Sequence, residues 1–384
     1  MKKILFIFCF FPCILTACKQ NKTKAQTTAN TVTADGSLNG SLSGNLNELR
    51  EKIKAYYEQN LTRTGFSGQF LVAKNGEVMY EDYAGYADFR TEAPMKPTTS
   101  LHVASTSKTF TGMTLLRLWE QGRVSLDDDL HKFFPRFPYN GITVKLLLSH
   151  RSGLPNYLQF MNKGWNKHKI ATNEDVLNFM IQNKPPIAAA PDKRFQYCNT
   201  NFMLLALIIE KITHQPFPEY MKDSVFTPLG LNDTYIFSIK DTDDYVPTYS
   251  VSKPFPMDYL DCTYGDKNVY TTARDLLEWD QILYDGSFVK NSTLEMAYKP
   301  RSNERHSIHN YGYAWRMLIQ PDQKIIYHNG LWHGTNAVFT RYIQDSVTII
   351  VIGNKTNSNI YHCKNLGALF TDSSKIMENS DTEE

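Results

Sequence analysis

The sequence lacks the features of a metal-binding, nucleic-acid-binding or membrane-spanning protein. Its six cysteines and ten histidines show no paired spacing of a metal centre, so we expect no metal and no cofactor. The 41 basic residues are balanced by 39 acidic ones, and this composition predicts no partnership with nucleic acid. The apolar run at residues 4–14 is too short to span a bilayer as an ordinary helix, and no internal repeat is visible.

What is present indicates one large exported domain. The chain has 384 residues, 42% of them hydrophobic and 13% aromatic, which is enough for a substantial core. It begins with the basic Met1-Lys2-Lys3 and closes its apolar leader with Leu15-Thr16-Ala17-Cys18. This pattern resembles the signal of a bacterial lipoprotein. We expect residues 1–17 to be a signal peptide and Cys18 to carry the lipid, with a plain secretory signal as the alternative.

Polar segments flank the expected domain at both ends. Residues 18–45 are rich in Thr, Asn, Ser and Gly, so we expect a flexible tether that follows the lipidated cysteine. Residues 46–372 form the expected globular domain, and residues 373–384 form a polar tail. This arrangement predicts a membrane-anchored lipoprotein of the cell envelope that faces the periplasm or the exterior.

The most informative motif is Ser105-Thr106-Ser107-Lys108, which stands ahead of a largely apolar run. Residues three apart share one face of a helix, so the amine of Lys108 is expected near the hydroxyl of Ser105. A serine hydroxyl is a weak nucleophile until a base takes its proton. Lysine acts as that base in its neutral form, which burial favours. At a helix start, the backbone N–H of Ser105 is also a donor that can stabilise an oxyanion.

The Ser-x-x-Lys spacing recurs at residues 250–253 and 287–290, so spacing alone does not identify a catalytic pair. Ser250 lies among prolines, and Ser287 follows the turn sequence Asp285-Gly286. Only Ser105 precedes a long apolar helix. A helix-capping serine is the alternative interpretation of this position.

Two further motifs follow along the chain. Tyr197 and Asn199 stand just ahead of an apolar helical run, where the phenol can relay a proton and the amide can hold a substrate carbonyl or orient the lysine. His328 and Gly330 end a β-rich stretch, where His328 can add a side-chain donor for the substrate and glycine permits close approach of the substrate to the backbone. Taken singly, these residues also fit a helix cap, a packed tyrosine and a satisfied polar histidine.

In this order, Ser-x-x-Lys, Tyr-x-Asn and His-x-Gly resemble the class C β-lactamase and D,D-peptidase family of serine hydrolases, which includes related esterases. Residues 146–155, 226–231 and 265–276 are also similar to that family. The resemblance implies Ser105 as nucleophile and Lys108 as the activating amine. It further implies Tyr197 as the proton shuttle and Asn199 as the amide that positions the substrate.

The resemblance also implies an oxyanion hole formed by the backbone N–H groups of Ser105 and Leu331, the residue after Gly330. His328 stands where many members carry the lysine of a Lys-Thr-Gly motif. A neutral histidine meets a substrate carboxylate less well than lysine does. We therefore expect an esterase or a D,D-carboxypeptidase rather than an efficient β-lactamase.

The expected substrates are small esters, amides or peptidoglycan-derived peptides that acylate the serine. The rival hypothesis is a binding protein of the same fold, a penicillin-binding or peptidoglycan-sensing protein without turnover. The aromatic, proline-containing segment at residues 245–264 is expected to be an ordered loop. It either selects the acyl donor or is a surface elaboration.

The expected fold is α/β (α+β), of the β-lactamase/transpeptidase type. We expect a helix at 47–59, a hairpin at 66–83 around Asn75-Gly76, helices with Pro-rich loops at 126–283, strands at 311–354 and a last helix near 359–370. The N- and C-terminal segments would share one antiparallel sheet flanked by helices. The mainly helical insertion subdomain would lie beside that sheet.

Overall fold

The computed structural model describes residues 37–370 of the chain. Its strands are β1 (Gly68–Lys74), β2 (Glu77–Ala84), β3 (Tyr86–Asp88), β4 (Ala93–Pro94), β5 (Leu101–His102), β6 (Tyr235–Ile236), β7 (Val269–Thr271), β8 (His309–Tyr311), β9 (Arg316–Ile319), β10 (Lys324–Trp332), β11 (Thr335–Tyr342) and β12 (Val347–Gly353). Its α-helices are α1 (Ser37–Asn60), α2 (Ser107–Glu120), α3 (Val144–Leu148), α4 (Tyr157–Gly164), α5 (Asn173–Asn183), α6 (Asn199–Thr213), α7 (Phe217–Met221), α8 (Ala273–Asp285) and α9 (Asn291–Ala297). Its 3-10 helices are η1 (Thr62–Thr64), η2 (Ala104–Thr106), η3 (Leu130–Lys132), η5 (Thr227–Leu229), η6 (Ile239–Asp241) and η7 (Ser358–Leu369), and η4 (Lys222–Phe226) is a π-helix.

A seven-stranded antiparallel sheet joins the two ends of the domain, in the order β2-β1-β12-β11-β10-β9-β8. β1 pairs with β12, so segments far apart in the sequence lie side by side in this sheet. The β1–β2 turn falls at Asn75 and Gly76, whose φ values of 52° and 78° suit a two-residue hairpin turn. The predicted sheet from N- and C-terminal segments is confirmed.

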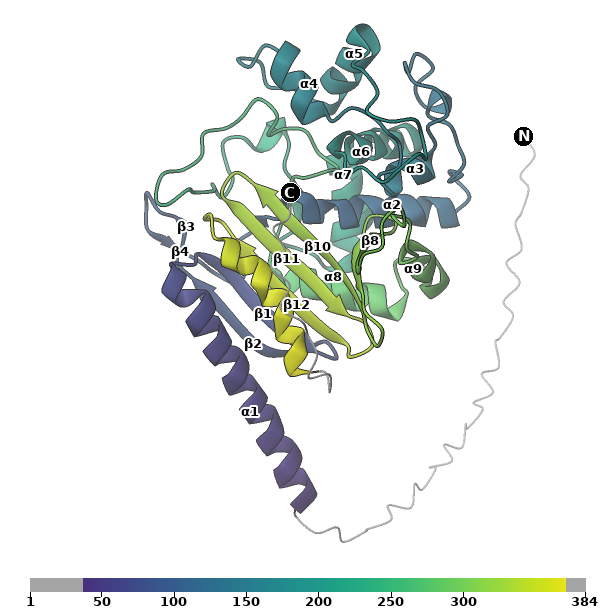
Figure 1. Ribbon diagram of the computed structural model, residues 1–384. Coiled ribbons are helices and arrows are strands. Elements are labelled where there is room, and N and C mark those ends of the chain that lie inside the picture. The colour runs from purple at the N-terminus through teal and green to yellow at the C-terminus, as the bar shows by residue number, and fades with distance from the viewer. Residues whose placement is uncertain (1–36, 371–384) are drawn as a thin grey trace, which may run out of the picture. The chain divides into compact units, whose positions relative to one another are not determined.

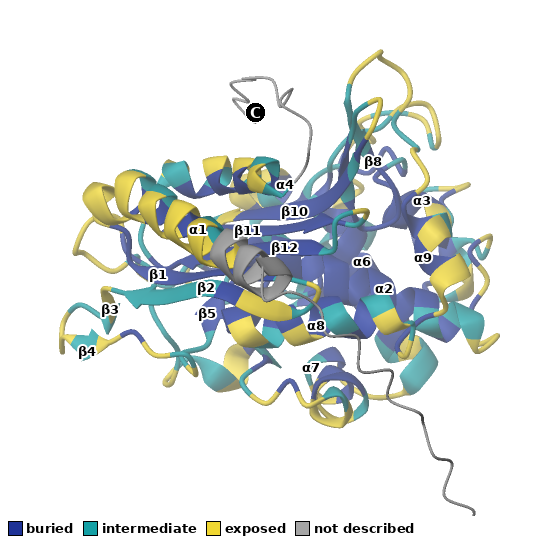
Figure 2. Ribbon diagram, turned by 90° about the horizontal axis from the view of Figure 1, so that it is seen from below, coloured by how far each residue is buried: buried dark blue, intermediate teal, exposed yellow. Residues whose placement is uncertain are grey.

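Both faces of this sheet are covered by helices (Figure 1). The part of α1 from Leu46 onward and η7 cover one face, and α2 and α8 lie on the other. The burial pattern follows the same layers, with buried strands enclosed between helices whose outer sides are exposed (Figure 2). The sheet is therefore a close-packed platform at the centre of the domain.

Strand β12 shows why two separate layers of helices can pack on one sheet. Successive side chains of a strand point to opposite faces. Val347, Ile349 and Val351 belong to the core beneath α1, whereas Ile350 and Ile352 belong to the core beneath the helical region. The strand is apolar on both faces, so each face must be covered.

The helical region lies beside the sheet and holds a second large core. α6 buries ten consecutive residues, Thr200–Ile209, so it is enclosed on all sides. α2 packs against α6 and buries most of its own residues, Lys108 among them. A charged residue in such a wall needs polar partners, because an unpaired buried charge is strongly destabilising.

Some boundaries differ from those expected. α1 begins at Ser37, so residues 37–45, expected to belong to the tether, are helical. Extending an existing helix costs little once its first turn has formed, and polar composition alone does not stop it. The last helix, η7, is a 3-10 helix. Cys18, the predicted signal peptide and the polar tail lie outside the described residues. Between residues 37 and 370, no helix is both long and apolar enough to cross a bilayer.

Candidate active site

The predicted nucleophile and base are in direct contact. Ser105 lies on η2, immediately before α2, and Lys108 lies in the first turn of α2. Ala104 has a φ of 45°, a left-handed conformation that turns the chain sharply into the helix. Ser105 stays partly exposed, whereas Lys108 is 0% exposed. Nζ of Lys108 lies 3.0 Å from Oγ of Ser105.

The Lys108 amine is held on two further sides. Nζ donates to Oδ1 of Asn199 at 2.9 Å and to the backbone oxygen of Asp266 at 2.8 Å. When Nζ accepts the proton of Ser105, both oxygens can stabilise the ammonium that forms. The arrangement can therefore activate a serine nucleophile.

Tyr197 lies over the same amine. The centroid of its ring is 5.0 Å from Nζ of Lys108. Its hydroxyl oxygen is buried and has no hydrogen-bond partner within residues 37–370. A buried polar atom without a partner costs free energy, so a bound substrate group that bonded this hydroxyl would be stabilised. This position suits the proton shuttle that the sequence predicts.

Gly330 brings the sheet against the nucleophile turn. A Cβ atom at Gly330 would lie 2.2 Å from the backbone oxygen of Val103, so only glycine fits this contact. Across the hairpin, Gly330 faces Ala337 and Trp332 faces Thr335. Trp332 and Thr335 close a two-residue turn as a hydrogen-bonded pair, and such pairs alternate with non-hydrogen-bonded ones in antiparallel strands. Leu331 therefore faces Asn336 in a non-hydrogen-bonded pair, and its N–H points away from β11.

The other edge of β10 is open at this point. β9 pairs with β10 only along residues 324–327. Within the described residues, the sheet therefore supplies no partner for the N–H of Leu331. The side chain of Leu331 is 63% exposed. The backbone donors of Ser105 and Leu331 thus suit an oxyanion hole, which needs a pair of donors near the nucleophile.

His328 is separate from the Ser105–Lys108 contact. Its side chain is fully buried, with Nδ1 2.8 Å from the backbone oxygen of Asn329 and Nε2 3.3 Å from the hydroxyl of Tyr311. Burial, and then the charges of Arg316 and Lys108, hold the pKa of His328 well below its usual range. The imidazole is neutral, its Nδ1–H donates to Asn329, and its Nε2 accepts from Tyr311. His328 therefore brings no positive charge to the site.

Arg316 supplies a cation that the sequence analysis missed. It stands at the start of β9, opposite Tyr327 of β10, and its guanidinium carbon lies 5.1 Å from the centroid of the Tyr197 ring. The sequence signal that could have identified Arg316 is its position at the start of β9, the strand before the one that carries His328 and Gly330. Arg316 also lines a cavity of about 490 Å³ together with Phe195 and Tyr311.

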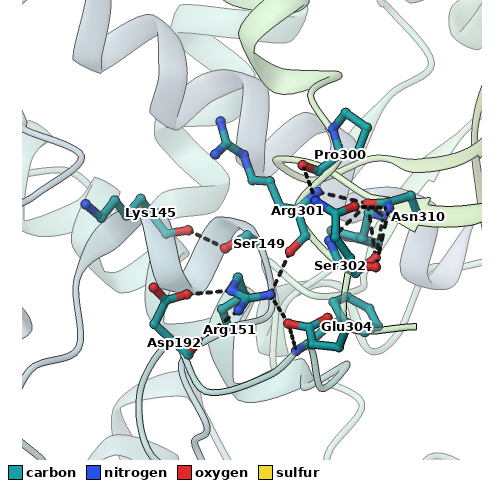
Figure 3. Close-up of polar contacts among 12 residues, drawn as sticks. Lys145, Ser149, Arg151, Asp192, Pro300, Arg301, Ser302, Glu304 and Asn310 are labelled. Carbon is teal, nitrogen blue, oxygen red and sulfur yellow. Dashed lines mark hydrogen bonds and ion pairs between the residues drawn. The ribbon is translucent and has the colours of Figure 1, made fainter. Parts of the chain in front are cut away.

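A network of polar contacts shapes the rim of this cavity (Figure 3). Arg151 lies between two acidic residues, with Nε donating to Asp192 at 2.5 Å and Nη1 paired with Glu304. The backbone N–H of Phe195 also donates to Glu304, at 3.3 Å. These contacts join the segment at residues 192–195, ahead of Tyr197, to Glu304, ahead of β8. The two segments that form this cavity wall are therefore held together.

The segment at residues 245–264 is attached to the end of β10. Asp261 accepts hydrogen bonds from Nε1 of Trp332 at 2.8 Å and from Nε2 of His333 at 3.0 Å. A small cavity of about 30 Å³ remains between this segment and the β10–β11 turn. The attachment lies directly beyond Leu331, and selection of the acyl group by this loop stays a prediction. No cluster of three or more potential metal ligands occurs among the residues that the structure describes.

The fold and this site define a class of serine hydrolases built on an antiparallel sheet and a Ser-x-x-Lys helix. The chain belongs to the Beta-lactamase family, whose model matches residues 53–369. It is 30% identical to Penicillin-binding protein 4* of Bacillus subtilis (strain 168) over 331 residues, which cover 81% of this chain and 73% of that relative.

Two solved structures are similar in fold. The D-amino acid amidase from Ochrobactrum anthropi SV3, complexed with D-phenylalanine, has a TM-score of 0.68 at 20% identity, and the match covers 84% of this chain and 98% of the amidase. EstCE1, a hydrolase with promiscuous acyltransferase activity, has a TM-score of 0.70 at 20% identity, with coverage of 86% and 100%. The chain thus has a relative named for penicillin binding, and its fold occurs in an amidase and in an acyltransferase-active hydrolase.

Gly330→Ala tests the contact between the sheet and the nucleophile turn. The added Cβ would force β10 away from Val103 and displace the N–H of Leu331. A misplacement of about 1 Å costs on the order of 100-fold in rate, so we expect labelling of Ser105 by a fluorophosphonate to slow by roughly that factor. Labelling of Gly330→Ala at the wild-type rate would contradict this account.

The control for this variant is Gly141→Ala, in the loop ahead of α3. Its Cβ would meet nothing within 4 Å, although its φ of 72° adds local strain. Gly141→Ala therefore reports the effect of a general loss of stability on labelling. We expect it to label at close to the wild-type rate.

Proposed function

We propose that this chain is an exported, lipid-anchored serine hydrolase that forms an acyl-enzyme on Ser105. Its substrates would be esters or the D-amino-acid amide bonds of cell-envelope peptides. The observation that carries the proposal is the 3.0 Å contact between Lys108 and Ser105, with the amine held by two further oxygens. The penicillin-binding relative and the amidase of the same fold support this choice of substrates.

In the proposed reaction, Oγ of Ser105 attacks the substrate carbonyl carbon while its proton passes to Nζ of Lys108. The oxyanion that forms accepts hydrogen bonds from the N–H groups of Ser105 and Leu331. Tyr197 relays a proton to the leaving nitrogen or oxygen, the bond to the leaving group breaks, and the acyl group remains on Ser105. Water then attacks this ester, which releases the acid and restores the serine.

Arg316 suggests the chemistry of the leaving group. Its guanidinium lies beside Tyr197, the residue that would protonate the leaving atom, and it lines the cavity of about 490 Å³. Guanidinium groups bind carboxylates with two parallel hydrogen bonds. His328 is buried and neutral and cannot take this role. The proposal therefore favours leaving groups that carry a carboxylate, such as a terminal D-amino acid.

The first test is acylation of the full-length protein, followed by intact-protein mass spectrometry. We expect fluorophosphonate and p-nitrophenyl acetate to add to the wild type and not to Ser105→Ala. Lys108→Ala should slow acylation about 100- to 10,000-fold, because the base is lost. Ester turnover with little penicillin turnover would support the hydrolase. A stable penicillin adduct would favour the penicillin-binding alternative, and no adduct from any probe would favour a non-catalytic binder.

The second test concerns the charge of the leaving group. Two esters with the same acyl group are compared, one with a free carboxylate on the leaving group and one with that carboxylate methylated. Hydrogen bonds to charged groups contribute about 1.5–3 kcal/mol, so we expect kcat/KM to favour the carboxylate by about 10- to 100-fold. Arg316→Gln should remove this preference, whereas the exposed Arg136→Gln should keep it. A preference that survives in Arg316→Gln would contradict the assignment.

The lipid anchor is tested separately. Two or more acyl chains hold a protein firmly on a membrane, since each buried methylene contributes roughly 0.8 kcal/mol. We expect the wild type to fractionate with membranes and the Cys18→Ser variant to be released. Membrane association that persists in Cys18→Ser would rule out lipidation at this residue as the anchor.

A further inference from the structure

His150 is a buried residue beside Tyr197 that the proposed reaction does not use. It follows α3 with a φ of 54° and is 0% exposed. The centroid of its ring lies 4.3 Å from that of Tyr197 and 4.8 Å from that of Tyr311. A polar ring among aromatic side chains is costly to bury, so the hydrogen bonds that it makes indicate what it does.

Tyr197 lies in a short segment without regular structure, so its neighbours have no helix or strand to bond with. His150 supplies the partners on both sides. The N–H of Gln196 donates to the backbone oxygen of His150 at 2.8 Å, and the N–H of Cys198 donates to its Nδ1 at 3.1 Å. The backbone on either side of Tyr197 is therefore bound to one residue.

The imidazole is fixed in one tautomer. A backbone N–H can only donate, so Nδ1 of His150 must be unprotonated to accept from Cys198. Nδ2 of Asn201 lies 3.1 Å from the same nitrogen, while Oδ1 of Asn201 accepts from Ser152 at 2.6 Å. Burial, and then the charge of Lys108, hold the pKa of His150 well below its usual range. The ring is thus neutral, with its proton on Nε2.

Arg151, the residue after His150, holds the start of the segment at residues 192–198, which contains Tyr197. Arg151 donates from Nε to the carboxylate of Asp192 at 2.5 Å and from Nη2 to the backbone oxygen of Asp192 at 2.9 Å (Figure 3). Its own backbone oxygen accepts from the N–H of Asp192 at 2.8 Å. Residues 150 and 151 therefore fix residues 192–198 as a unit. His150 acts at the end that carries Tyr197.

We infer that His150 is a positioning residue, which holds Tyr197 through its Nδ1 and its backbone oxygen so that the hydroxyl meets the leaving group. This inference rests on the proposed function, because it assumes that Tyr197 relays a proton. A shift of the phenol by about 1 Å would cost on the order of 100-fold in rate. A residue needed only for packing would depend on the bulk of its ring and not on the acceptor at Nδ1.

The test is a double-mutant cycle in the full-length protein, with turnover of an alkyl ester as the readout, because its alkoxide leaving group needs a proton to depart. His150→Leu keeps apolar bulk but removes the acceptor for Cys198. His150→Asn keeps an acceptor near the place of Nδ1 and tolerates a positive φ. We expect His150→Leu to lower kcat roughly 10- to 100-fold with little change in KM, and His150→Asn to stay within about threefold of the wild type.

The Tyr197→Phe background separates positioning from packing. Because that variant has no hydroxyl to position, His150→Leu should cause no further loss in it. Equal losses of kcat on His150→Leu in the wild type and in Tyr197→Phe would overturn the inference. A His150→Asn variant that is as slow as His150→Leu would also overturn it. Circular dichroism shows whether His150→Leu folds. If it does not, folded His150→Asn decides: a loss of more than about tenfold in kcat overturns the inference, and retained activity supports it.

The same experiment distinguishes the two proposals. A wild type that shows neither ester turnover nor labelling of Ser105 overturns the proposed function, and this inference with it. A reactive wild type whose His150 variants all react at its own rate overturns the inference alone.

Discussion

The site depends on one buried amine and on the oxygen atoms that surround it. Nζ of Lys108 lies inside the apolar wall of α2, yet it contacts three segments: the turn with Ser105, the start of α6 at Asn199 and the backbone of Asp266. A buried amine that lost these partners would be strongly destabilised. The three segments are therefore held together by the same contacts that would activate the serine in the proposed reaction, so the proposed catalytic geometry is also a condition of stable packing.

A second constraint joins this helical region to the sheet. Gly330 permits the strand to approach Val103 so closely that no side chain fits between them, and Val103 is two residues ahead of the nucleophile. Because β9 ends before this point, the strand edge keeps a backbone donor beside Ser105 that the sheet does not use. The proposed oxyanion hole would thus arise from an incomplete sheet, a feature that needs no specialised side chain.

Residue spacing predicted only those contacts of the site whose partners are close along the chain, and the resemblance to a known family implied the distant Tyr197, Asn199 and Leu331. Ser105 and Lys108 are three apart, so helical spacing alone brings them together, and the Asn75-Gly76 turn signal was sufficient to predict the first hairpin. The roles of His150 and Arg316 could not be found this way. His150 bonds Cys198 across 48 residues, and Arg316 reaches Tyr197 only because β9 folds back along β10. Such contacts follow from the tertiary structure and leave no periodic pattern in the sequence.

His328 stands where many members of the family carry lysine, so the positive charge of the site lies elsewhere. The imidazole is bound at both nitrogens, so it stabilises the strand and brings no charge. The cation comes instead from Arg316 on the neighbouring strand, against the ring of the proposed proton shuttle. A guanidinium is a flat, directional fork, whereas an ammonium is a point charge. Under the proposed function, a charge on β9 instead of β10 would place recognition on the side from which the leaving group departs, and that recognition would depend on the orientation of a carboxylate.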